Sequence, residues 1–218
     1  MKGLLIKDLR LVLKRKNSLL VFLPVCAMIA FSTGNGGFAI GYTAFLLGVM
    51  GLSTLAFDER GNGFPFLFSL PVDTKTYVNE KFLFCILADL AGLALGCALF
   101  LLVCAAKGRM DAFREDIVYA LFYLPGTVLL ILSVLTVQMI FGIEKSRIVT
   151  LVVYGALFAI SALLVKTVGP IGSSRAFRSI PACLKNPYCV AAIFAVFAAG
   201  GCAVLYLICR RTMRNKQF

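Results

Sequence analysis

A stretch of 41 residues without a charged side chain, residues 17–57, constrains this chain more than any other feature of its sequence. As one α-helix it would be about 62 Å long, twice the roughly 30 Å hydrocarbon core of a bilayer. The stretch must therefore fold back on itself. Its only turn-forming cluster is Thr33-Gly34-Asn35-Gly36-Gly37, which predicts a tight hairpin. Two membrane spans result, over residues 18–32 and 38–57.

The composition places the whole chain in a membrane. Hydrophobic residues make up 61% of the sequence and charged residues 15%, whereas soluble proteins have roughly 45–50% and about 25%. A water-soluble domain of 218 residues has too little interior for so many apolar side chains, and disordered chains are poor in them. The chain contains no histidine, which excludes serine–histidine or cysteine–histidine catalysis and histidine-ligated metal sites.

Four more apolar runs follow the hairpin, and each reaches or approaches the ~20 residues that a helix needs to cross a bilayer. They are residues 82–106, 117–143, 148–165 and 187–209. The runs are too long for barrel strands and do not alternate, so helices are the structure that satisfies the backbone in lipid. We therefore predict an all-α integral membrane protein with six transmembrane helices, forming a single domain over residues 1–218.

The positive charges predict the orientation of these spans. With six spans both termini lie on one side, and that side holds 15 of the 22 lysines and arginines. The excess predicts that both termini are cytoplasmic, and it explains the net charge of +12 as membrane-flanking charge without nucleic-acid binding. Segment 166–186, which contains four of the remaining cations, is expected to be an extracellular or re-entrant cap.

The eight cysteines do not indicate a zinc site, because no Cys-x-x-Cys pair occurs. Six of them fall within apolar runs, where cysteine behaves as a small hydrophobic residue. Cys183 and Cys189 lie in a polar connection. Their spacing allows a disulfide and two free thiols equally.

The N-terminal segment, residues 1–17, has the pattern of an amphipathic helix. Its apolar face contains Leu5, Ile6, Leu9, Val12 and Leu13, and its other face contains Lys7, Arg10 and Lys14. A basic helix with an apolar stripe is typical of the membrane interface. We expect this segment to lie along the bilayer surface before the chain enters its first span.

The connection 58–81 is the longest on the cytoplasmic side and the least hydrophilic. It opens with Asp58-Glu59-Arg60, turns at Gly61-Asn62-Gly63, and then presents the run Phe64-Pro65-Phe66-Leu67-Phe68-Ser69-Leu70-Pro71. Such a surface is expected to be covered by the membrane interface or by a partner protein. Asp73 or Thr74 can cap a helix that leads into the third span.

Polar groups inside the spans are few. Asp89 lies about two turns from the cytoplasmic end of the predicted span 82–106, where it could reach the interface or pair with a cation of a neighbouring helix. Gln138, in the fourth span, is more typical of a hydrogen bond between helices than of a substrate ligand. An intramembrane protease or lipid-modifying enzyme would need paired catalytic groups, which these two residues do not supply.

Two parts of the sequence resemble small permease subunits of bacterial type-2 ABC exporters, the ABC-2 family transporter proteins. The first is the opening segment, residues 1–9. The second is the connection in which Asp58-Glu59-Arg60 is followed by Ser69-Leu70-Pro71-Val72 and then by Tyr77-Val78-Asn79-Glu80-Lys81-Phe82. Chain length and the six-span layout are similar as well. The resemblance implies the type-2 ABC exporter transmembrane-domain fold.

The resemblance also implies partners and contact residues. The chain would be a half-sized transmembrane domain that pairs with a second permease subunit, identical or paralogous. Segment 1–17, with Leu5, Leu9 and Val12, would be the elbow helix, and segment 58–81 would be the coupling loop seated on a cytoplasmic ABC ATP-binding subunit. The apolar contacts would be Phe64, Phe66, Phe68, Leu70 and Pro71, beside a polar latch of Asp58, Glu59 and Arg60.

The ATPase of such a transport system must be a separate chain. The sequence has no Gly-x-x-x-x-Gly-Lys-Ser/Thr phosphate loop, so it cannot bind ATP by that means. We expect ATP and Mg²⁺ to be bound by the partner, and this chain to be a transport subunit of the bacterial cytoplasmic membrane with no cofactor, metal ion or catalytic residue of its own. Its substrate is expected to be hydrophobic or amphipathic: a peptide, a lipid or a drug.

Two other functions fit parts of the pattern. The substrate-binding membrane subunit of an ATP-driven vitamin importer has a similar length and number of spans, but it needs a polar pocket near the outer face, where these spans offer few polar groups. A purely structural anchor would leave the phenylalanine run of the connection unexplained.

Overall fold

The computed structural model describes residues 2–14, 16–32, 36–59, 73–108, 110–168 and 187–215, and in these residues the chain is helical throughout except at short turns. The helices are α1 (Lys2–Lys14), α2 (Lys16–Ser32), α3 (Gly36–Glu59), α5 (Thr74–Lys107), α6 (Met110–Phe141), α7 (Ile143–Val168) and α9 (Pro187–Asn215). The expectation of an all-α protein is thus confirmed for the described part of the chain.

Four helical segments in the described residues are long and apolar enough to cross a membrane: Gly36–Glu59, Thr74–Lys107, Tyr123–Phe141 and Ala191–Arg214. They contain most of the predicted spans 38–57, 82–106, 117–143 and 187–209. The predicted spans 18–32 and 148–165 lie on α2, which has 17 residues, and on α7. That these two helices also cross the membrane stays a prediction.

Helix boundaries differ from the predicted spans because a charge-free run marks the hydrocarbon layer, whereas a helix continues beyond it while its backbone bonds are made. α5 begins at Thr74, eight residues before the predicted span. Residues 144–147, which we predicted to connect two spans, form the first turn of α7. Gly142 alone separates α6 from α7.

The predicted hairpin is wrong in one detail, since Gly36 and Gly37 belong to α3 and are buried. The Gly36 backbone N–H donates to the Asp116 carboxylate at 3.1 Å. A Cβ on Gly36 would lie 2.1 Å from the Phe100 ring. Gly36 therefore serves a close helix contact rather than a turn.

The start of α5 lies where the sequence predicts it. Asp73 occupies the position before the helix in an extended conformation (φ −66°, ψ 142°), but its side chain makes no capping hydrogen bond. The Asp73 carbonyl instead accepts the backbone N–H of Tyr77 at 3.1 Å.

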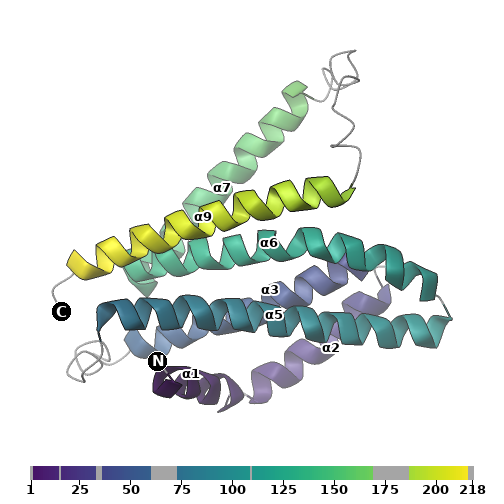
Figure 1. Cartoon of the computed structure of the whole chain (residues 1–218), viewed down its shortest axis with the longest axis horizontal. Coiled ribbons are helices and arrows are strands. Elements are labelled where there is room, and N and C mark those ends of the chain that lie inside the picture. Colours follow the sequence, from purple (N-terminus) through teal and green to yellow (C-terminus); the bar gives the residue numbers. More distant parts are fainter. Residues whose placement is uncertain are drawn as a thin grey trace.

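Helices α3, α5 and α6 form the centre of the bundle, and α9 runs along α6 (Figure 1). α1 and α2 lie beside α3 and α5, whereas α7 leans away from the other helices. α5 approaches α3 closely at two glycines. A Cβ on Gly92 would lie 2.7 Å from Ala44 Cα, and one on Gly96 would lie 3.0 Å from Ile40 Cα.

One end of the bundle gathers segments from five helices. Leu55 of α3, Tyr77 of α5, Met139 of α6 and Met213 of α9 belong to one buried cluster, with Leu4 of α1 packed against it. α1, the start of α5, the α6–α7 junction and the end of α9 accordingly lie at the same end in Figure 1. We call this the loop end, because residues 60–72 connect α3 to α5 there.

Candidate functional site: a buried ion cluster at the loop end

Lys81 is the centre of an ion cluster that joins α1, α3 and α5. Its side chain is fully buried. Its Nζ lies 2.7 Å from Asp58 Oδ2, forms an ion pair with Asp8 and donates to the Thr54 hydroxyl at 3.2 Å. A single lysine of α5 therefore binds carboxylates from two other helices.

Asp58, on α3, contacts side chains of α1 and α5. Its Oδ1 accepts a hydrogen bond from Lys7 Nζ at 2.6 Å, and its Oδ2 accepts one from the Tyr77 hydroxyl at 3.0 Å. The side chain is almost completely buried. Residues 58 and 77 flank the connection 60–72, so the ion cluster ties the two ends of that loop together and ties both to α1.

The local sequence explains why these groups meet. Tyr77, Glu80 and Lys81 are three and four residues apart and therefore share one face of α5. On α1, Leu4 and Asp8 are likewise four residues apart and face the bundle, while Ile6, Leu9 and Leu13 remain about half exposed.

The cluster contains more acidic than basic side chains. The carboxylates of Asp8, Asp58 and Glu80 surround the ammonium groups of Lys7 and Lys81. Glu80 is fully buried, its Oε2 lies 4.0 Å from Lys81 Nζ, and neither of its oxygens has a hydrogen-bond partner in the described part of the chain. Removing one partner of such a pair leaves an uncompensated buried charge, which costs about 3–5 kcal/mol.

Asp8 is the member of the ion cluster that the sequence reasoning missed. We assigned α1 an apolar and a basic face and gave its one carboxylate no role. Yet Asp8 is the first acidic residue of the chain, and the next is Asp58. A single acidic residue in a basic helix, fifty residues before the next acidic residue, is the sequence feature that could have identified Asp8. The structure places Leu9 on the exposed face of α1, with Leu5 and Val12 partly buried beside it.

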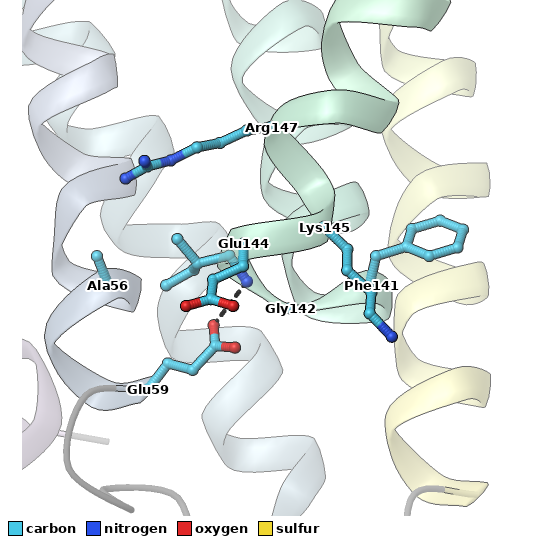
Figure 2. A pocket seen from close by; sticks show the side chains of 8 residues that line it. Ala56, Glu59, Phe141, Gly142, Glu144, Lys145 and Arg147 are labelled. Carbon is cyan, nitrogen blue, oxygen red and sulfur yellow. Dashed lines mark hydrogen bonds between the residues drawn. The ribbon is translucent and has the colours of Figure 1, made fainter.

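Glu59 points to a different part of the bundle. Its Oε2 accepts the backbone N–H of Ile143, the first residue of α7, at 2.8 Å (Figure 2). Beside this contact is a cavity of about 530 Å³. The cavity is lined by Ala56, Glu59, Phe141, Gly142, Ile143, Glu144, Lys145 and Arg147.

The carboxylates of the predicted polar latch, Asp58 and Glu59, are thus both engaged by this chain's own residues. Their contact with an ATP-binding subunit stays a prediction. The other predicted coupling residues fall outside the described residues: Arg60, Phe64, Phe66, Phe68, Leu70 and Pro71.

Asp89 lies well inside α5. Because α5 begins at Thr74, Asp89 is 15 residues, about 22 Å, from the start of the helix. It is fully buried, and its Oδ2 accepts the Thr127 hydroxyl of α6 at 3.0 Å. The ion pairs found in the described residues do not include Asp89. A neutral hydroxyl therefore takes the place of the cation that we considered.

Gln138 of α6 is partly buried, and its side-chain oxygen has no hydrogen-bond partner among the described residues. The structure therefore does not show the contact between helices that we expected of it. Nor do the described residues contain a group of three or more His, Cys, Asp or Glu side chains suited to a metal ion. In the ion cluster, the lysine ammonium groups lie between the carboxylates.

Apolar helices of membrane length, packed around a charged junction at one end, define an α-helical membrane protein. The chain belongs to the family of ABC-2 family transporter proteins, whose family model matches residues 3–213. This confirms the resemblance drawn from the opening segment and the connection 58–81. Permease subunits of this family generally pair with separate ATP-binding subunits and dimerise. No curated protein and no solved structure matches the chain significantly.

Proposed function

We propose that the chain is the membrane-spanning permease subunit of an ATP-driven exporter and that two such subunits form the translocation path. ATP would be hydrolysed by a separate ABC ATP-binding subunit, with its Mg²⁺, on the cytoplasmic side of a bacterial membrane. Both termini would lie on that side. The family supports the permease role. The scarcity of polar side chains in the spans favours a hydrophobic or amphipathic substrate.

The observation that carries the coupling part of this proposal is the ion cluster around Lys81. A loop that receives force from a partner must pass it to the transmembrane helices rather than bend at its ends. Asp58 and Lys81 join the helices on either side of residues 60–72 at 2.7 Å. Because the pair is buried, solvent screens it little. Force on the loop would therefore move α3 and α5 together.

The same cluster extends the movement to α1. Lys7 binds Asp58 and Asp8 binds Lys81, so α1 is attached to both helices. Its exposed Ile6, Leu9 and Leu13 form an apolar face that fits the membrane interface. In the proposed cycle, closure of two ATP-binding subunits would push the loops, and α1, α3 and α5 would tilt as one unit between inward- and outward-facing states.

Loss of the phenylalanine contacts in the loop tests this function. The chain would be co-expressed with its ATP-binding subunit, and the membranes extracted in mild detergent. Phe66→Asp with Phe68→Asp should abolish copurification of the ATP-binding subunit while leaving the permease in the membrane. Arg211→Ser with Arg214→Ser, exposed at the end of α9 and outside the predicted span 187–209, is the control because it changes the net charge by the same amount. Undiminished copurification with the loop variant would refute the coupling role of residues 60–72.

A further inference from the structure

α7 is attached to the described bundle mainly through one other helix. It packs chiefly on α6 and leans away from α9 (Figure 1). Leu151 is 75% exposed, and Ile148 and Val152 are also largely exposed. Along its length it is held by a hydrogen bond between Tyr154 and Ser133 of α6. A helix with so small a contact area can change its angle at little cost in buried surface.

The joint between α6 and α7 is one residue long. α6 ends at Phe141, α7 begins at Ile143, and Gly142 between them has φ +77°. Backbone in this left-handed region is natural for glycine and strained for other residues. The cavity of about 530 Å³ beside the joint leaves space for movement.

The first turn of α7 takes a cap from another helix. The first N–H groups of any helix lack partners within that helix, and a carboxylate there is stabilised by the helix dipole. Gly142, which precedes α7, has no side chain to provide the cap. Glu59 of α3 provides it, and a Cβ on Gly142 would lie 2.7 Å from Glu59 Oε1. Glycine at this position therefore both sets the backbone angle and leaves room for the carboxylate.

Glu59 is also the last residue of α3, next to the loop 60–72. Asp58 and Glu59 are consecutive, and they point to different helices: Asp58 to α1 and α5, and Glu59 to α7. Movement of the end of α3 reaches α7 through the Glu59 carboxylate at 2.8 Å.

We infer that Glu59 is a positioning residue of the transport cycle: it transmits displacement of the loop 60–72 to α7, which turns at Gly142. The inference rests on the proposed function, because it takes the loop to be the part that the ATP-binding subunit displaces. The loop end then has two connections to the transmembrane helices. Displacement of the loop would move α3 with α5 through Asp58, and it would move α7 through Glu59.

The cap itself can be tested on the chain alone by hydrogen–deuterium exchange in nanodiscs. Loss of a cap weakens the first turn of a helix, so Glu59→Ala should speed exchange of residues 143–146 roughly five-fold. Glu59→Gln keeps an oxygen acceptor and should restore slow exchange. Arg147→Ala, which changes another side chain lining the same cavity but lies outside the measured segment, should leave it unchanged. Unchanged exchange in Glu59→Ala would refute the cap and the inference with it.

The transmission requires the complex with the ATP-binding subunit. Spin labels would be attached through bio-orthogonal amino acids at Leu151 of α7 and Val204 of α9, both of which are largely exposed. This route leaves the native cysteines in place. The distance between the labels would be measured with and without ATP and vanadate. It should shift on trapping in the wild type and in Glu59→Gln, and should not shift in Glu59→Ala.

The outcomes separate the two proposals. A shift that persists in Glu59→Ala, or no shift in a wild-type complex that hydrolyses ATP, overturns the role of Glu59 and leaves the proposed function standing. Failure of the wild-type chain to bind any ATP-binding subunit overturns the proposed function, and the transmission role falls with it. Loss of the shift in Glu59→Ala, with binding retained and rescue by Glu59→Gln, supports both.

Discussion

The Lys81 ammonium group lies 2.7 Å from the Asp58 carboxylate, and this ion pair holds α3 and α5 together on either side of the loop 60–72. The Lys81 side chain is fully buried, and the Asp58 side chain is almost completely buried. The pair is one contact of a larger cluster that includes α1. Its burial, rather than its geometry alone, makes it a fixed connection between helices.

Lys81→Met should destabilise the protein by about 3–5 kcal/mol, because it removes the buried cation of the cluster and leaves the carboxylates of Asp8 and Asp58 with Lys7 alone. Thermal unfolding in detergent, followed by circular dichroism, measures the effect. Glu80→Gln is the matched control: it removes an acidic group from the same cluster, where acidic side chains outnumber basic ones, and should change stability by less than about 1 kcal/mol. A larger loss from Glu80→Gln than from Lys81→Met would contradict the arrangement of the cluster.

Gly142→Ala should destabilise the protein by about 1–2 kcal/mol, since alanine is strained at φ +77° and its Cβ would press on the Glu59 carboxylate. Gly155→Ala, within α7, provides the comparison. No atom lies within 4 Å of the added methyl group there, and alanine favours a helix over glycine by about 1 kcal/mol. The melting temperatures of the two variants should therefore move in opposite directions.

Gly92→Ala should separate α5 from α3, because the new methyl group would meet the backbone of Ala44 at 2.7 Å. Backbone atoms cannot rotate away, so a loss of about 1–3 kcal/mol is expected, as for other overpacked sites. Gly200→Ala, in α9, has open space around the added Cβ and should stabilise slightly, as Gly155→Ala does. Equal stability of the two variants would show that α3 and α5 are not in close contact at Gly92.

A tryptophan probe can locate α1 relative to lipid, since the chain has no tryptophan of its own. Leu9→Trp places the probe on the exposed apolar face, and Lys14→Trp places it on the basic face. If α1 lies in the membrane interface, lipids brominated on their acyl chains should quench the first variant much more strongly than the second. Similar quenching of both would argue against the interfacial position.

The apolar runs predicted where most helices lie because a membrane helix needs a continuous apolar stretch, and this requirement is written directly into the sequence. They did not predict the helix ends. The charged residues Glu144 and Arg147 read as a connection, yet they form the first turn of α7, because a helix leaving the hydrocarbon layer continues until a residue such as Gly142 breaks it.

The contacts at the loop end depend on tertiary packing and were only partly predictable. Asp58 and Glu59 were singled out because the resemblance to ABC-2 permeases implies a polar latch at these positions. Their partners could not be predicted, because Lys7, Lys81 and the backbone of Ile143 are brought together by three separate helix crossings. Asp8 could have been singled out as the lone acid of its region, but its pairing with Lys81 required knowledge of which face of α1 meets the bundle.

The consecutive placement of Asp58 and Glu59 restricts how this chain can change in length. Neighbouring positions on a helix are rotated by about 100°, so deletion of one residue within α3 would turn both carboxylates away from their partners at once. A deletion between residues 60 and 72 would leave them where they are. Evolutionary insertions and deletions within α3 should therefore be purged.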